Sequence, residues 1–269
     1  MSFMSREMKL VLVMVAMVLF GAVGCGKAAR ANVSGHVGPT NVTPVQKLRF
    51  TDHVRYHNMG IAWDGDYYYT INGGNSGSSD INKYDESGKF EENYDLSVDG
   101  RAILYNSDEE QLYLKENGTD LSSVDLDLEE ANVEHSGIFQ GEQSHVAMSP
   151  DGSSLYELSD GKVHVYDASS GDVNDSFDLS SYSSDDDGGY AYAIAASDKF
   201  LFVWAPNSDK DILVFDLEGK YVTKFTLPRS GYGYSLSWAN DMLWVARDAD
   251  GGTDGADGTW YGYELEGLE

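Results

Sequence analysis

The chain is poor in cysteine, proline and basic residues, and the lack of cysteine and of positive charge limits what it can be. It has one cysteine in 269 residues, which excludes an internal disulfide and a zinc site built from a cysteine cluster. It has five prolines, and only 18 lysines and arginines against 45 aspartates and glutamates. The resulting net charge of −27 repels phosphate groups, so we expect neither nucleic acid nor anionic lipid headgroups as ligands of the folded part.

Enough apolar residues remain to form a folded core. Hydrophobic residues make up 41% of the chain and aromatic residues 12%, including 18 tyrosines. Charge alone would suggest disorder, but this apolar fraction can bury a core. The length allows one large domain or two smaller ones.

An apolar run near the N-terminus has the features of an export signal. Arg6 and Lys9 precede uninterrupted apolar and small residues from Leu10 to Gly24. This run would form about 22 Å of helix, short of the roughly 30 Å of a bilayer core. A basic start, a short apolar stretch and small residues before a cleavage site describe a secretory signal.

The run ends in Ala22-Val23-Gly24-Cys25, which resembles the lipobox of bacterial lipoproteins. In that family the cysteine is acylated and becomes the new N-terminus. The resemblance implies an exported protein anchored to the cell envelope through Cys25, with the outer membrane favoured because Gly26 is not the aspartate that retains such proteins at the inner membrane. Leucine is commoner than alanine at position 22 of this motif, so an ordinary signal peptide with an incidental cysteine is the alternative.

These features divide the chain into three parts. We predict a signal peptide over residues 1–24, an acylated cysteine and flexible tether over residues 25–46, and a folded domain over residues 47–269. The lipid anchor would be the only contact with the membrane.

The remainder repeats with a period of 42 to 48 residues. Each repeat opens with a short apolar strand, and these strands begin at Ile61, Ile103, Val146, Ile194 and Leu236. A polar turn, a second strand and a third strand follow. The third strand ends in an apolar residue and an acid, namely Tyr84-Asp85, Val124-Asp125, Tyr166-Asp167, Phe215-Asp216 and Tyr263-Glu264. A glycine comes three or four residues after each of these acids except the second.

Short strands separated by Asp/Gly turns indicate hairpins, and a fourth strand follows in four of the repeats. Four strands in about 45 residues form one blade, so the fold class is all-β and the architecture a five-bladed β-propeller. The fifth repeat lacks a fourth strand, because nothing after Leu265 can form one. We expect residues 47–52 to supply that outer strand and close the ring, whereas an open five-sheet solenoid would leave both edges bare.

Two segments resemble known propellers. Residues 148–173 (MSPDGSSLYELSDGKVHVYDASSGDV) look like the repeats of YVTN-type propellers. Residues 60–90 are similar to blades of NHL-type and glutaminyl-cyclotransferase-like propellers, and WD-repeat proteins share the layout. The resemblance covers residues 47–269 and implies a fold, not a function.

Candidate ligand contacts come from the loops that lead into the innermost strands, which should line one mouth of the central channel. Counting back from the strand starts assigns to this mouth Arg101, Tyr192, Tyr234, His57 and His145. Tyrosine suits amphipathic ligands such as sugars or peptides, and Trp63 joins this contact set. The alternatives are that the tyrosines pack between blades, that Trp63 and Trp238 pack in the core, and that Arg101 pairs with Asp99 or Glu142.

Two groups of oxygen ligands are candidates for a divalent cation. The first, Asn58, Asp99 and Glu142, follows from the resemblance to lactonases and related propeller hydrolases. The second lies in an acidic loop and would bind Ca²⁺ through Asp248, Asp250, Asp254 and Asp257. A solvated hairpin loop is the alternative for that second group.

The sequence therefore predicts an envelope-anchored propeller that binds a protein or a glycan. No catalytic residue is assigned, because a motif such as Gly-x-Ser-x-Gly is missing, and no cofactor is assigned beyond the candidate Ca²⁺. The alternative is a divalent-cation-dependent hydrolase or lyase, lactonase-like or cyclotransferase-like. A channel plugged by side chains would favour the binding protein, and a divalent ion at the channel mouth would favour the enzyme.

Overall fold

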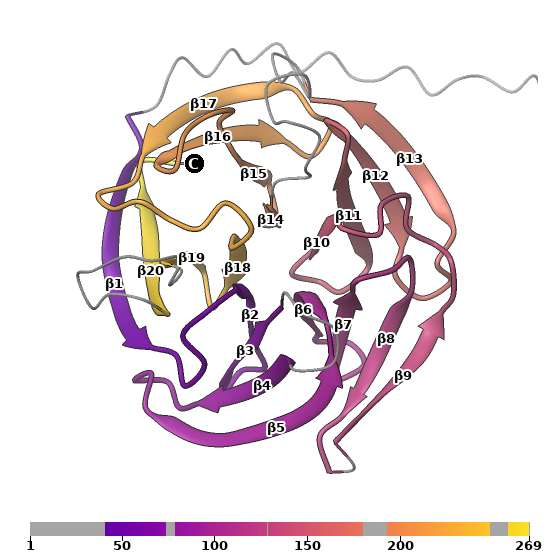
Figure 1. The fold of residues 1–269 in the computed structure, drawn as a ribbon. Coiled ribbons are helices and arrows are strands. Elements are labelled where there is room, and N and C mark those ends of the chain that lie inside the picture. The colour runs from indigo at the N-terminus through magenta and orange to yellow at the C-terminus, as the bar shows by residue number, and fades with distance from the viewer. Residues whose placement is uncertain (1–40, 74–78, 128, 180–192, 248–257, 269) are drawn as a thin grey trace, which may run out of the picture. The chain divides into compact units, whose positions relative to one another are not determined.

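The strands of the chain form five four-stranded antiparallel sheets arranged in a ring (Figure 1). The structure, a computed structural model, describes residues 41–73, 79–127, 129–179, 193–247 and 258–268. All of them belong to the compact unit of residues 37–269, so the predicted signal peptide, Cys25 and the tether up to residue 40 lie outside the described residues. Within the described part, no helix is long and apolar enough to cross a membrane. The predicted five-bladed β-propeller is confirmed.

Each sheet is one blade, and its strands run outwards from the channel in chain order, except where the ring closes. Blade 1 contains β2 (Asn58–Trp63), β3 (Tyr68–Asn72), β4 (Ser79–Tyr84) and β5 (Phe90–Val98). Blade 2 contains β6 (Gly100–Asn106), β7 (Gln111–Glu116), β8 (Leu121–Asp125) and β9 (Glu130–His135). Blade 3 contains β10 (His145–Met148), β11 (Ser154–Ser159), β12 (Lys162–Asp167) and β13 (Val173–Asp178).

The last two blades follow the same plan. Blade 4 contains β14 (Ile194–Ala196), β15 (Phe200–Trp204), β16 (Asp211–Asp216) and β17 (Tyr221–Thr226). Blade 5 contains β18 (Ser237–Ala239), β19 (Met242–Arg247), β20 (Thr259–Glu266) and, as its outer strand, β1 (Thr43–Thr51).

The repeated acids close the hairpins between third and fourth strands. The Asp85 Oδ1 atom accepts hydrogen bonds from the backbone N–H groups of Ser87 and Lys89, each at 2.9 Å. Gly88 then takes a φ of 79°, which only glycine adopts without strain. Asp216 and Gly219 repeat this arrangement in blade 4, where φ is 82°. The turn geometry thus explains why acid and glycine recur together.

Each pair of neighbouring blades encloses one hydrophobic cluster. Side chains alternate along a strand, so Ile61 packs against blade 5 while Ala62 faces blade 2. The residues with which the repeats open each contribute to a different cluster, these being Ile61, Ile103, Val146, Ile194 and Leu236. The core of the protein is therefore five interfaces between blades rather than one centre.

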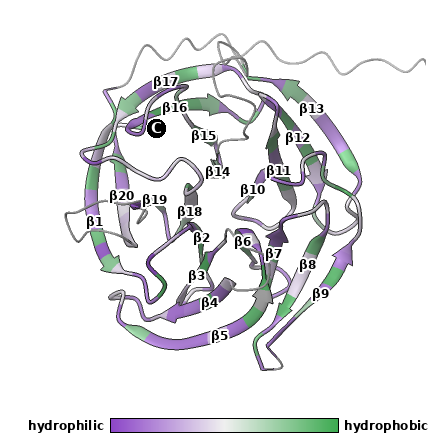
Figure 2. Cartoon of the chain, in the orientation of Figure 1, coloured by the Kyte–Doolittle hydropathy of each residue, from purple (hydrophilic) through white to green (hydrophobic). Residues whose placement is uncertain are grey.

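The N-terminal strand closes the ring, as expected. β1 pairs antiparallel with β20, from Thr43 opposite Glu266 to Thr51 opposite Thr259. Hydrophobic and hydrophilic residues alternate along β1, as an outer strand with one covered face requires (Figure 2). The strand begins four residues before the predicted position 47, so the C-terminal end of the expected tether belongs to the propeller.

Candidate functional site

The predicted channel-mouth residues that the structure describes lie where the innermost strands begin. Most of them form hydrogen bonds or ion pairs with other residues of the chain. Arg101 is 7% exposed. Its Nη1 atom donates to Asp99 Oδ1 at 2.6 Å and its Nε atom to Gln143 Oε1 at 3.0 Å. The guanidinium therefore forms the internal ion pair that the sequence offered as the alternative to ligand binding.

His145 lies inside the channel rather than at its mouth. Its Nδ1 atom accepts a hydrogen bond from the Ile194 N–H at 3.4 Å, and its Nε2 atom lies 3.4 Å from the Met59 carbonyl oxygen. The Nδ1 atom accepts, so Nε2 carries the proton that it donates to Met59. Burial lowers the pKa of His145 to about 4, and the ring is neutral at pH 7. The three residues come from blades 3, 4 and 1, so this side chain spans the channel.

His57 and Tyr234 form part of a small aromatic group beside that mouth. The His57 Nδ1 atom lies 3.2 Å from the Tyr232 hydroxyl oxygen. The rings of Tyr232 and Tyr234 are 5.3 Å apart and pack against the cluster between blades 1 and 2. Tyr192, the remaining candidate contact at this mouth, lies outside the described residues.

The first candidate cation site is engaged by other groups only in part. Asp99 pairs with Arg101, and the Asn58 Nδ2 atom donates to Asp52 Oδ2 at 3.0 Å and to the Val54 carbonyl oxygen at 2.8 Å, whereas the buried Asn58 Oδ1 atom accepts no hydrogen bond from the described residues. In the part of the chain that the structure describes, no group of three or more His, Cys, Asp or Glu side chains could hold a metal ion. The second candidate site lies outside the described residues, and this applies to Asp248, Asp250, Asp254 and Asp257.

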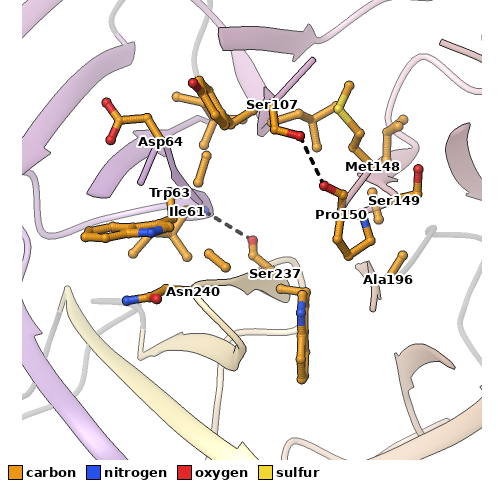
Figure 3. Close-up of a pocket in the computed structure, with 18 of the residues that line it drawn as sticks. Ile61, Trp63, Asp64, Ser107, Met148, Ser149, Pro150, Ala196, Ser237 and Asn240 are labelled. Atoms are coloured by element: carbon orange, nitrogen blue, oxygen red, sulfur yellow. Dashed lines mark hydrogen bonds between the residues drawn. The ribbon is translucent and has the colours of Figure 1, made fainter. Parts of the chain in front are cut away.

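A cavity of about 370 Å³ opens at the other end of the channel, where the innermost strands end (Figure 3). Each blade contributes two side chains from alternate positions of its innermost strand. The deeper level contains Ile61, Ile103, Val146, Ile194 and Leu236. Two residues further along each strand, the outer level contains Trp63, Tyr105, Met148, Ala196 and Trp238. The cavity thus has an aliphatic floor and a wall with three aromatic rings.

Polar groups of the following turns form the rim. They include Asp64, Ser107, Ser149, Asn240 and Asp241. Hydrogen bonds between neighbouring blades fix the wall, since the Ile61 N–H donates to Ser237 Oγ at 3.1 Å and the Ser107 hydroxyl donates to the Pro150 carbonyl oxygen at 3.4 Å (Figure 3). The cavity is therefore held open by contacts that are part of the fold.

Both tryptophans of the wall are supported from behind. Trp238 stacks on Phe202 with ring centroids 5.4 Å apart and planes 3° from parallel. Trp63 lies 4.3 Å from the ring of Tyr68. Each indole is half-buried, so part of its surface is left to the cavity. Trp63 and Trp238 therefore combine the packing role that the sequence suggested with a place in the wall of the cavity.

The rim is negatively charged. The Asp64 carboxylate is fixed by the Tyr67 N–H at 2.6 Å and by the Tyr69 hydroxyl at 2.9 Å. Asp64 and Tyr105 also line a second cavity of about 370 Å³ between blades 1 and 2, which contains Glu110, Asp125 and Asp127. Burial raises the pKa of Tyr105, and its phenol stays neutral.

Sequence reasoning overlooked the cavity as a whole although the signal was present. The predicted contacts precede each innermost strand, whereas the cavity lies after it. Three of the five repeats carry an aromatic residue two positions after their opening aliphatic residue, at Trp63, Tyr105 and Trp238. Strand alternation places such residues on one face, and an aromatic residue at the same position of several blades could have located the cavity.

No family model and no curated protein matches the sequence. Solved structures do match in fold. One is the glutaminyl cyclase of Myxococcus xanthus, with a TM-score of 0.60 and 10% identity over 86% of this chain and 100% of that chain. The gluconolactonase XC5397 of Xanthomonas campestris has a TM-score of 0.49 and 12% identity, covering 85% and 99% of the two chains. The hydrazine synthase of Kuenenia stuttgartiensis has a TM-score of 0.42 and 16% identity, covering 73% and 59%.

Of these likenesses, only the first is close enough to support an argument about the fold. At 10% identity it carries no information on residues or activity. The chain is a five-bladed β-propeller whose overall fold is similar to that of the Myxococcus xanthus glutaminyl cyclase.

Proposed function

We propose that this protein is a ligand-binding propeller whose channel cavity takes the apolar part of an amphipathic ligand. The observation that carries the proposal is the cavity itself, with an aliphatic floor, aromatic walls and a polar rim. Concave sites of this composition, in which few polar groups orient a largely apolar ligand, are typical of small-molecule sites. We propose that this ligand is part of an envelope protein or a glycan, the partners that the sequence predicts.

His145 leaves only one end of the channel open to a ligand. Its side chain spans the channel and is 4% exposed, which closes the channel beneath the cavity. A plugged channel of this kind is what we expected of a binding protein rather than of an enzyme with a cation at its centre. The ligand would enter between the turns that follow the innermost strands.

We further propose that the propeller is attached to the cell envelope through acylated Cys25, with the outer membrane as its location. The support is the apolar run that ends in Ala22-Val23-Gly24-Cys25. The propeller begins at Thr43, so residues 26–42 would separate the anchor from the binding domain. Incorporation of labelled palmitate, and its loss in Cys25→Ser, tests this part independently of the ligand.

Binding can be tested with N-phenyl-1-naphthylamine, a neutral dye that fluoresces in apolar cavities. We expect saturable binding by the full-length protein with one site. Ser107→Trp places a large side chain at the rim, and Ala196→Phe fills the cavity from β14, so each should weaken binding at least tenfold. Ser136→Trp, at an exposed position of blade 2 away from the cavity, is the matched control. Unchanged binding in both cavity variants would overturn the assignment of the site.

A second candidate function is a divalent-cation-dependent hydrolase or lyase, lactonase-like or cyclotransferase-like. The observation that favours it is the similarity in fold to a glutaminyl cyclase that this chain covers completely. The test is turnover of a peptide with N-terminal glutamine and of a small lactone, with and without a chelator. Turnover that the chelator abolishes would establish this alternative, and its absence with both substrates would remove it.

A further inference from the structure

We infer that the ligand of the channel cavity carries an organic ammonium group, and that Trp63, Tyr105 and Trp238 provide the aromatic faces that bind it. This inference rests on the proposed binding function and names its ligand class. Two independent features of the cavity lead to it: the aromatic wall and the distribution of charge around the rim.

The aromatic wall is suited to a cation. An ammonium group over the face of Trp or Tyr is attracted by the negative π surface, and several rings around one site recognise quaternary ammonium ions. The three aromatic rings come from blades 1, 2 and 5, which are neighbours in the ring of blades. Trp238 and Trp63 are held by Phe202 and Tyr68, so little ordering of these side chains is needed on binding.

The charges around the cavity are of one sign. Asp64 and Asp241 lie at the rim. None of the described residues that line the cavity is a lysine, an arginine or a histidine. Such a site repels carboxylates and phosphates and attracts cations, as does the net charge of −27 of the whole chain.

The second cavity indicates where the cation would lie. Asp64 and Tyr105 belong to both cavities, and Glu110, Asp125 and Asp127 add negative charge beyond them. These carboxylates concentrate negative charge on the Tyr105 side of the channel cavity. The ammonium group would lie there, and the apolar part of the ligand would extend over the aliphatic floor formed by residues such as Ile103 and Val146.

The test compares choline with 3,3-dimethylbutan-1-ol, which has the same shape but a carbon in place of the charged nitrogen. We expect calorimetry on the full-length protein at low salt to show choline binding about tenfold tighter or more, because a cation–π contact is strongest where the cation is desolvated. Added salt should reduce the difference, because it screens the carboxylates. Tyr105→Leu should reduce the preference for the cation, whereas Tyr105→Phe, which keeps the ring, should retain it.

The outcomes separate this inference from the function on which it rests. Equal affinity for the two probes, or a preference that Tyr105→Leu leaves unchanged, would overturn the ammonium assignment while leaving the apolar cavity as a binding site. Failure of both probes to bind, with the neutral dye still bound, would also overturn it. Failure of the dye as well would remove the proposed function itself.

Discussion

The Nε2 atom of His145 lies 3.4 Å from the carbonyl oxygen of Met59, although blades 3 and 1, which hold them, are not neighbours in the ring. The same imidazole accepts a hydrogen bond from the Ile194 N–H of blade 4. One side chain therefore links three blades across the channel. The bond from Ile194 needs the neutral ring, since protonation of Nδ1 would remove the acceptor, whereas Nε2–H can donate to Met59 in either state.

This arrangement predicts a loss of stability in acid. The unfolded chain binds a proton on His145 near pH 6.5, but burial lowers the pKa of the folded state to about 4. Between these values the unfolded state binds more protons, so the free energy of unfolding falls as the pH falls from 6.5 to 4. The contribution from this group is at most about 3 kcal/mol. Urea unfolding at a series of pH values measures it.

His145→Gln is the control for that prediction. Glutamine can donate and accept hydrogen bonds but does not titrate, so the difference in unfolding free energy between the two proteins isolates the histidine. We expect this difference to favour the wild type most at pH 7 and to shrink towards pH 4. A difference that stays constant over this range would contradict the assignment of a neutral, buried imidazole.

Ring closure depends on a buried carboxyl group as well as on strand pairing. Directly after β1, Asp52 accepts hydrogen bonds from the Tyr84 hydroxyl of blade 1 and from Trp260 Nε1 of blade 5, both at 2.6 Å. Asp52→Ala leaves these buried donors without a partner, and we expect the free energy of unfolding to fall by about 3 kcal/mol. Asp66→Ala, at an exposed turn, should change it by less than about 0.5 kcal/mol. Equal effects of the two substitutions would show that Asp52 does not secure the closure.

The fold could be predicted from the sequence because its signals are local and repeated. An incomplete fifth repeat and an unpartnered segment at residues 47–52 were enough to predict how the ring closes. Its start at Thr43 was not predicted, because Pro44 and its small polar neighbours resemble a linker. In the structure β20 of blade 5 extends to Glu266, so β1 can pair with it from Thr43 onwards.

The sites were harder to predict, because they depend on which side chains meet across blades. From the sequence, Arg101 could face a ligand or an internal acid, and only the structure shows that it forms an ion pair with Asp99. That His145 reaches Met59 depends on the width of the channel, which no spacing in the sequence encodes. The cavity wall was within reach of sequence reasoning, but the strand starts drew attention to the other end of the channel.

A buried lysine is expected to be essential for the loops of blades 2 and 3. Lys115 is fully buried, and the three N–H groups of its Nζ atom are shared among four backbone carbonyl oxygens, those of Glu116, Gly118, Gly141 and Glu142, which lie 2.5 to 3.3 Å away. Desolvation lowers its pKa to about 8, which leaves the ammonium largely protonated at pH 7. Lys115→Met keeps the apolar stem but leaves the carbonyls unsatisfied, and we expect a loss of about 3 kcal/mol in the free energy of unfolding.

Lys89→Met is the matched control for this substitution. Lys89 is exposed and pairs with Glu91 at the surface, so its removal should leave the free energy of unfolding almost unchanged. Chemical denaturation at pH 7 compares the two variants. If Lys115→Met proved as stable as Lys89→Met, the hydrogen bonds of Lys115 would make no net contribution to the free energy of unfolding. The loops of blades 2 and 3 would then be held by their backbone contacts alone.

The turn of blade 2 offers a stabilising substitution. Glu129 takes a φ of 51° in the hairpin that follows Asp125, where the other repeats place a glycine. A side chain in this left-handed region costs about 1–2 kcal/mol, whereas glycine adds about 0.5–1 kcal/mol of chain entropy to the cost of folding. Glu129→Gly should therefore raise the free energy of unfolding by about 0.5–1 kcal/mol.

The reverse change in blade 1 should have the opposite effect. Gly88 has a φ of 79°, and a Cβ atom there would lie 2.6 Å from the Phe50 ring. Gly88→Ala combines strain with a clash against β1, so we expect a loss of more than about 2 kcal/mol. Thermal unfolding of both variants is the measurement. If Glu129→Gly lowered the melting temperature, the side chain of Glu129 would be making a favourable interaction that outweighs the strain of its backbone, and the glycine of the other repeats would not be equivalent to it.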